Sequence, residues 1–209
     1  NHLNNASVFS NESQYNKKRT VGNFANLSVA WKNMLYLSGS IRNDIVSSMP
    51  RDNRSFTYPS VSLGFIFTEL APLKNNILTF GKIRASYGLV GNDRIGGERF
   101  LFLPDAYIRV SSPGYYFGTG QTKYSGYKES KLGNPYVTWE KAKKTNLGLD
   151  LRFFKDRLNF SADYFIEKRS NILYSLNLPL WFGDPSIVPP YNVGRTENKG
   201  YEFEFGYKD

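Results

Sequence analysis

The chain has 209 residues, of which 16 % are aromatic, and this content of large apolar side chains excludes a disordered protein. It contains no cysteine and a single histidine, His2. Disulfide scaffolds, thiolate metal sites and multi-histidine zinc sites are therefore excluded, and a Ser-His-Asp triad would need an implausible reach from the terminus. We expect no enzyme, no metal and no cofactor. The formal net charge of +9 raises nucleic acid or anionic lipid as partners.

Alternation of apolar and polar side chains recurs along the chain, as is typical of β-strands with two different faces. The segments that show it are, in chain order, 25–31, 35–42, 60–67, 82–89, 146–153, 158–167 and 201–207. No apolar run approaches the roughly 18 residues of a membrane-spanning helix. The pattern predicts about seven strands joined in sequence as an antiparallel sheet.

The connections between these segments alternate in length. The shorter ones are 32–33, 68–78 and 155–157, and the longer ones are about 44–57, 92–136 and 171–195. Alternate connections of an up-and-down sheet lie at the same end of the sheet. One rim should therefore carry compact turns and the other large loops, as in outer-membrane β-barrels.

The two faces of the expected strands differ in charge, most cleanly in 146–153. Leu147, Leu149, Leu151 and Phe153 share one face, and Asn146, Gly148, Asp150 and Arg152 share the other. We expect the first set to contact lipid, because a slip of one residue would place Asp150 and Arg152 in hydrocarbon. A soluble sandwich also alternates, so a secreted β-sandwich that binds carbohydrate stays open as an alternative.

The polar face is expected to line the lumen. Its carboxylates are Asp150, Asp163, Glu202 and Glu204. We interpret them as partners of Lys82, Arg84 and Arg152 across a wet interior, rather than as a glycosidase pair.

Several segments are similar to motifs of one membrane-protein family. Residues 81–92 resemble the "LKLRASYGxxGN" strand of TonB-dependent outer-membrane transporters of the SusC-like (RagA-like) branch. Residues 132–141 resemble its "GNPxLxWEK" segment, and 192–202 its "NxGxxxNKGxE" segment. Residues 58–64 are similar to its "FPSxSxGW" strand, with Phe65 in place of the tryptophan. Several motifs in the family's order make the match specific.

The resemblance implies an all-β fold: an antiparallel up-and-down transmembrane β-barrel segment, about seven strands of a larger, plugged barrel of about 22 strands. It also implies a Gram-negative outer-membrane location, energy from the TonB complex, a SusD-like lipoprotein lid, and uptake of oligosaccharides or peptides. No segment resembles the plug. We therefore expect residues 1–209 to be part of one barrel domain, with the plug and the remaining strands outside this chain. A passive porin-like barrel is the remaining alternative.

Aromatic residues in the long connections are the candidate ligand contacts. They are Tyr107, Tyr115, Tyr116 and Trp181. Aromatic faces stack on sugar rings and on peptide side chains, whereas packing within the loop or against a lid is the alternative. Nearby Gly114, Gly118, Gly120 and Gly126 predict irregular turns rather than strands.

Aromatic residues also mark the rim with the short turns. Trp31, Phe153 and Tyr207 each occupy an outward position where a strand ends at that rim. Amphipathic rings favour the membrane interface, so we expect these three residues to belong to the periplasmic aromatic girdle.

Three lysines are expected to project outward at the rim with the long loops, namely Lys143, Lys168 and Lys199. That level faces the phosphates of lipopolysaccharide, and the alternative is that these lysines are solvated strand ends. Many of the other cations lie in loops or at strand ends, without the clustering on one face that nucleic-acid binding requires. We therefore expect outer-membrane lipid and lipopolysaccharide as partners, and no nucleic acid.

Overall fold

The computed structural model describes residues 17–70, 75, 77–93, 100–105, 107–128, 130–177, 179, 181 and 187–209. His2 lies outside these residues. Seven strands form one antiparallel sheet: β1 (Thr20–Trp31), β2 (Leu35–Val46), β3 (Ser55–Ile66), β4 (Leu78–Asn92), β7 (Glu140–Phe153), β8 (Leu158–Tyr174) and β9 (Tyr191–Tyr207). A separate hairpin pairs β5 (Ile108–Phe117) with β6 (Thr122–Lys128). Two 3₁₀ turns, η2 (Arg51–Asn53) and η3 (Phe67–Glu69), complete the described elements.

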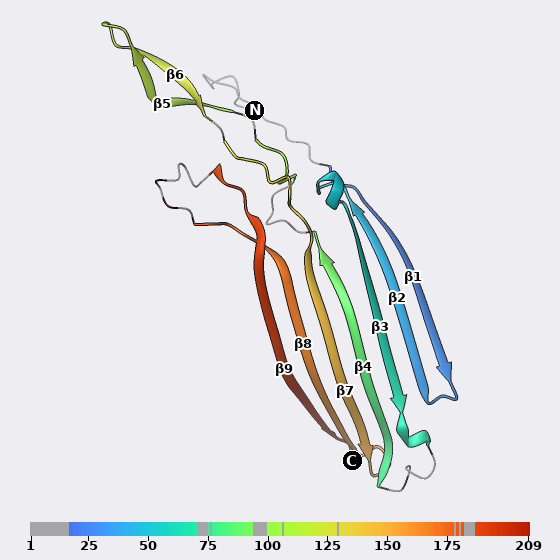
Figure 1. The fold of residues 1–209 in the computed structure, drawn as a ribbon. Helices are drawn as coiled ribbons and strands as arrows, with labels where there is room; N and C mark the ends of the chain where they lie inside the picture. Colours follow the sequence, from blue (N-terminus) through green and yellow to red (C-terminus); the bar gives the residue numbers. More distant parts are fainter. Residues whose placement is uncertain are drawn as a thin grey trace, which may run out of the picture.

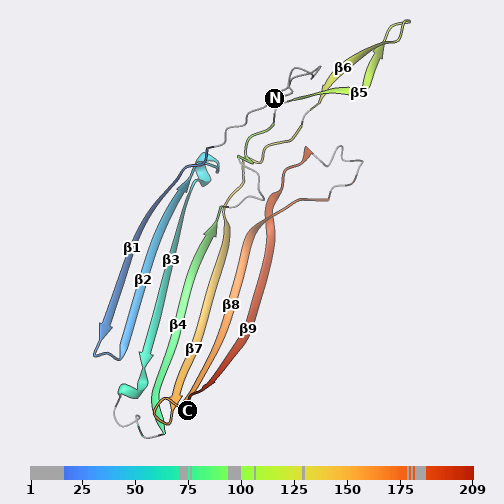
Figure 2. The same ribbon diagram turned by 180° about the vertical axis from the view of Figure 1, so that it is seen from behind.

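The large sheet has up-and-down topology. Its order is β1-β2-β3-β4-β7-β8-β9, so each strand pairs with the next one except where the hairpin is inserted between β4 and β7. The views from both sides show a single layer, with the hairpin beyond one end (Figures 1 and 2). Within the described ranges no second sheet packs on this layer, so these residues lack the two packed sheets that the β-sandwich alternative requires.

The two ends of the sheet differ as the connection lengths predicted. The β1–β2 turn takes positive φ angles at Lys32 and Asn33, and the β7–β8 turn does so from Phe154 to Asp156. These turns lie at the same end as the β3–β4 connection, and the long connections lie at the other end (Figure 1). Among the described residues, no helix has the length and apolar character needed to cross a membrane.

Trp31, Phe153 and Tyr207 are the last residues of β1, β7 and β9, and they lie at the short-turn end as expected. Their membership of an interfacial girdle stays a prediction.

Several strands are longer than the alternation indicated. The connection expected over 171–195 begins only after Tyr174, because β8 and β9 continue to pair there, with Ser170 opposite Arg195 and Tyr174 opposite Tyr191. In these extensions of β8 and β9 the side chains do not alternate regularly, although the backbones remain hydrogen-bonded. Phe67, expected to continue a strand, instead begins η3, and its ring covers Gly81 so closely that a Cβ there would lie 2.2 Å from Phe67 Cζ.

The register confirms the predicted alternation of faces. Ala85, Leu147, Tyr164 and Tyr201 lie opposite one another in four neighbouring strands. Lys82, Asp150 and Ser161 form a row on the opposite face. The apolar face is bare, and Leu27, Phe203 and Phe205 are 70 %, 65 % and 73 % exposed. An apolar surface of this extent requires a covering phase or partner.

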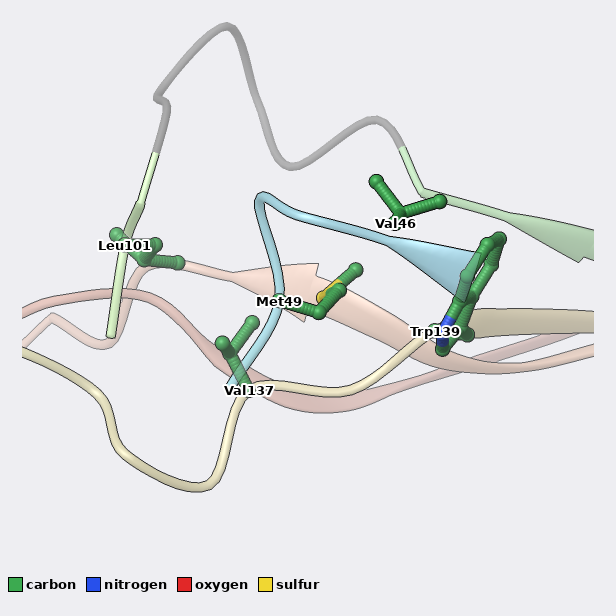
Figure 3. Packing of buried hydrophobic residues seen from close by; sticks show 5 residues of the cluster. All are labelled: Val46, Met49, Leu101, Val137 and Trp139. Atoms are coloured by element: carbon green, nitrogen blue, oxygen red, sulfur yellow. The ribbon is translucent and has the colours of Figure 1, made fainter. Parts of the chain in front are cut away.

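The buried apolar cluster lies at the long-loop end rather than on the sheet. It consists of Val46, Met49, Leu101, Val137 and Trp139 (Figure 3). The Trp139 indole nitrogen donates a hydrogen bond to the Asn53 carbonyl at 2.8 Å, which fastens the β2–β3 connection to the start of β7. Packing at this end therefore orders the long connections above the strands.

Candidate functional surfaces

A charged network crosses the polar face at the centre of the sheet. Arg84 of β4 donates to both carboxylate oxygens of Asp150 on β7, at 2.8 and 3.0 Å, and to Asp163 Oδ2 on β8, at 2.9 Å. The Ser161 hydroxyl donates to Asp150 Oδ1 at 2.8 Å. The interpretation of Asp150 and Asp163 as partners of Arg84 is confirmed.

Gly148 makes room for this network. A Cβ at this position would lie 2.6 Å from Asp163 Oδ1 and 2.7 Å from Arg84 Cζ. Asp163 Oδ1 is buried and has no hydrogen-bond partner among the described residues. Arg152 differs from the expectation, because its guanidinium lies 4.8 Å from the Phe80 ring centroid, and no described carboxylate is within ion-pair distance of it. The ring lies beside Arg152 on the neighbouring strand and offers a cation–π contact instead.

A second polar group lies on the same face of β2 and β3. Arg42 Nε is 2.9 Å from Asp44 Oδ1, and the Tyr58 hydroxyl donates to the other oxygen of Asp44. Below it, Ser40 and Ser60 pair through their hydroxyls at 2.7 Å. Asp44 and Tyr58 were not predicted from the sequence, although Arg42 and Asp44, two residues apart on one strand, share a face and have opposite charges. The polar face is therefore bonded across strands at several levels.

Tyr115 and Tyr116 lie on the β5–β6 hairpin, which corrects the expectation of irregular turns there. Gly114 and Gly126 lie within strands, and only Gly118 and Gly120 lie in the turn. Backbone pairing across 108–128 outweighs the glycine content, because each added strand residue satisfies backbone groups that a loop would leave to water.

The hairpin separates two of the candidates. Tyr115 lies opposite Tyr124 and shares a face with Phe117, whose ring meets Tyr124 edge-on at 5.8 Å between centroids. Tyr116 lies opposite Lys123 on the other face. Tyr115 and Tyr116 therefore cannot form one platform, and the face of Tyr115, Phe117 and Tyr124 is the richer aromatic surface.

The remaining candidates lie elsewhere. Tyr107 precedes β5, and Trp181, which is 83 % exposed, lies in the connection between β8 and β9. The lysine candidates occupy the outward face: Lys143 lies opposite Lys168, and Lys199 lies one row lower, opposite Ile166. Ligand contacts of these residues stay predictions.

The family profile described as "TonB dependent receptor-like, beta-barrel" matches residues 1–208. The chain belongs to the TonB-dependent receptor β-barrel family. Members are Gram-negative outer-membrane barrels and transporters rather than enzymes. In such a barrel the face of Leu147 meets lipid and the face of Arg84 lines the lumen.

Individual relatives agree with the family. The TonB-dependent receptor SusC of Bacteroides thetaiotaomicron is 31 % identical over 189 residues, which cover 90 % of this chain and 18 % of SusC. A TonB-dependent receptor of Formosa agariphila is 29 % identical over 186 residues, which cover 88 % of this chain and 17 % of the relative. The chain thus spans less than a fifth of the length of these relatives.

Solved structures agree in fold. The RagAB peptide importer in its closed-closed state superposes with a TM-score of 0.74 at 25 % identity, over 89 % of this chain and 19 % of the importer chain. The siderophore receptor PirA of Pseudomonas aeruginosa superposes with a TM-score of 0.57 at 14 % identity, over 89 % of this chain and 30 % of PirA, and shares the fold alone.

Proposed function

We propose that this chain forms part of the barrel wall of a SusC/RagA-like importer that takes up oligosaccharides or peptides. The importer works with a SusD-like lipoprotein lid and draws energy from the TonB complex through parts of the protein outside these residues. The observation that carries the proposal is a two-faced sheet, apolar outside and ion-paired inside, that superposes on the RagAB peptide importer with a TM-score of 0.74.

The inner face suits a passage for polar cargo. Arg84 pairs with Asp150 and Asp163, and Lys82, opposite Asp150 on the same face, offsets the remaining negative charge. The hydroxyls of Ser40 and Ser60 are paired across β2 and β3. Such a wall is wettable, and because its charges are paired it does not present one strong field to a passing solute. Neutral sugars and peptides of mixed charge are compatible with this surface.

The β5–β6 hairpin supports a role in contacting cargo or lid. It projects beyond the long-loop end, which faces the cell exterior in this family of barrels (Figure 1). Tyr115, Phe117 and Tyr124 are exposed on one of its faces. Large exposed rings of this kind stack on sugars and peptides or pack against a protein partner.

The proposal is tested by uptake in the native host. Cells with and without the complete gene are given fluorescent oligosaccharides and fluorescent peptides, and internalised label is measured before and after the proton-motive force is collapsed. We expect gene-dependent uptake of one of the two substrate classes, which stops when the proton-motive force is lost.

Each outcome decides between functions. Gene-dependent uptake that persists without the proton-motive force would indicate the passive porin-like alternative. If cells with and without the gene take up each substrate class equally, the protein is not an importer of either class.

A further inference from the structure

Cations gather on the outward face where β7, β8 and β9 approach the long loops. Lys143 lies directly opposite Lys168, and Lys168 lies opposite Glu197. Arg195 lies opposite Ser170 in the next row towards the loops. All four side chains share the face that carries Leu147, Tyr164 and Tyr201 lower down the same strands.

The charges on this face are only partly balanced. Lys168 Nζ is 3.4 Å from Glu197 Oε2. In the part of the chain that the structure describes, no carboxylate lies within ion-pair distance of Lys143 or Arg195. Like charges directly opposite one another in a sheet are destabilising. An anion held between Lys143 and Lys168 would remove that repulsion.

The cations also line a hollow. Four cations border it, Lys143, Lys168, Arg169 and Arg195, together with Glu197, Ser170, Asn171 and Thr196. Four cations against one carboxylate leave the hollow positive. Ser170, opposite Arg195 on the outward face, also supplies a hydroxyl, so the hollow offers both charge and a hydrogen-bond donor to an oxyanion.

The hollow lies at the level of the outer membrane interface. Lys143 comes ten residues before Phe153, which ends β7 at the short-turn rim. A tilted strand crosses the hydrocarbon in about 9–11 residues. The two rows directly above the outward row of Thr145, Ile166 and Lys199 contain no apolar side chain. The first holds Lys143, Lys168 and Glu197, and the second holds Lys141, Ser170 and Arg195.

We propose that Lys143, Lys168 and Arg195 bind a phosphate of lipopolysaccharide in the outer leaflet. Lys168 lies on the middle strand of the three, and Glu197 offsets part of its charge. Lys199 belongs to the row of Ile166 and does not line the hollow, and Arg195 takes its place in the set expected from the sequence. The inference requires the outer-membrane location but no particular cargo or lid.

Binding of purified lipid A tests the inference in the complete protein in detergent. The outward pair Lys143→Gln with Lys168→Gln should weaken binding of diphosphorylated lipid A by about 25-fold, because each cation near an anionic lipid surface contributes about fivefold. Arg195→Gln alone should weaken it by about fivefold. Glu197→Gln should strengthen it, because one negative charge leaves the hollow.

The matched control lies on the inner face. Lys144→Gln with Lys82→Gln removes the same charge from that face, where Lys144 pairs with Glu167 and Lys82 lies opposite Asp150, and neither lysine borders the hollow. This control should bind lipid A as the wild type does. Dephosphorylated lipid A should bind every variant equally weakly, and inorganic phosphate should compete poorly because it lacks the acyl chains.

Several outcomes would overturn the inference. These are unchanged affinity in the outward pair, an equal loss in the inner pair, and no preference for the phosphorylated lipid. Folding is checked by the heat-dependent gel mobility of the barrel. If the glutamine pair fails to fold, two other variants decide the question. Weaker lipid A binding in Glu197→Gln would contradict the inference. So would a tenfold loss of binding in Lys143→Arg with Lys168→Arg, which keeps both charges.

Discussion

Arg84 is the cation that joins three strands of the inner face. It serves two carboxylates, Asp150 and Asp163, whereas Lys82 in the same strand makes no ion pair among the described residues. The side chains are about one-third exposed or less, so water screens the pairing only in part. Loss of Arg84 would leave two neighbouring carboxylates without their partner.

We predict that Arg84→Ala lowers the free energy of unfolding of the complete barrel by about 1–3 kcal/mol, and that Lys82→Ala has a smaller effect. Urea unfolding of the two variants in the same lipid or detergent measures the difference. Equal stability of the wild type and Arg84→Ala would show that the network contributes nothing measurable.

Trp139 is the largest side chain of the buried cluster at the long-loop end, and it is 3 % exposed. Its ring stacks on Phe56 with 5.5 Å between centroids, and its indole nitrogen bonds to Asn53. These contacts hold the connection between β2 and β3 against the start of β7. Trp181 offers a control, since it is 83 % exposed.

We predict that Trp139→Ala removes about 3–5 kcal/mol of packing and loosens the β2–β3 connection. Trypsin should then cleave the folded complete protein faster at Arg51 and Arg54, whereas Trp181→Ala should leave the cleavage rate unchanged. Cleavage at the wild-type rate in Trp139→Ala would mean that the cluster does not order this connection.

At the scale of elements, β7 shows how much the sequence could predict. The alternation from Asn146 to Phe153 was sufficient to assign both faces correctly, because polar residues in hydrocarbon carry a large free-energy penalty. The alternation did not predict that β7 begins at Glu140, since most residues from Glu140 to Thr145 are polar, although Lys143 was expected to project outward. Only backbone pairing with β4 and β8 defines that segment.

The hairpin and the buried cluster could not be predicted for a different reason. The cluster depends on contacts between residues distant in sequence, such as Met49 and Trp139. The hairpin depends on pairing within a glycine-rich segment, where the Tyr115 ring lies over Gly126. Neither pairing leaves a period in the sequence. The inner network could be predicted only in part from the sequence. Its residue types indicated ion pairs, but the structure was needed to show that Arg84, and not Arg152, is the cation that pairs with Asp150.

We predict that the two faces of the hairpin differ in function. Tyr115→Ala, Phe117→Ala and Tyr124→Ala together should reduce uptake or lid retention several-fold, whereas Tyr116→Ala with Tyr127→Ala, on the opposite face, should have little effect. Uptake by cells that carry equal amounts of each variant in the outer membrane measures this. Equal activity of both sets would exclude an aromatic contact on the face of Tyr115.

At the scale of the whole molecule, the seven-stranded sheet is one wall with two edges. β1 and β9 each pair with a single neighbour among the described strands. Unpaired backbone groups cost several kcal/mol each in lipid, so the wall is stable in a membrane only when other strands close it into a barrel. The exposed apolar face and the paired polar face then have their natural surroundings, lipid outside and a water-filled lumen inside.

The central claim, that this sheet is a lipid-facing barrel wall, is tested most directly by spin-label accessibility along β7. Single cysteines at positions 143 to 153 of the complete protein, with any other cysteine replaced, are labelled in lipid bilayers. Collision rates with oxygen and with a water-soluble nickel complex are then measured. We predict a period of two: oxygen-accessible labels at 147, 149 and 151, nickel-accessible labels at 146, 148, 150 and 152, and a return of nickel access at 143. Absence of this period, or the opposite phase, would contradict the account.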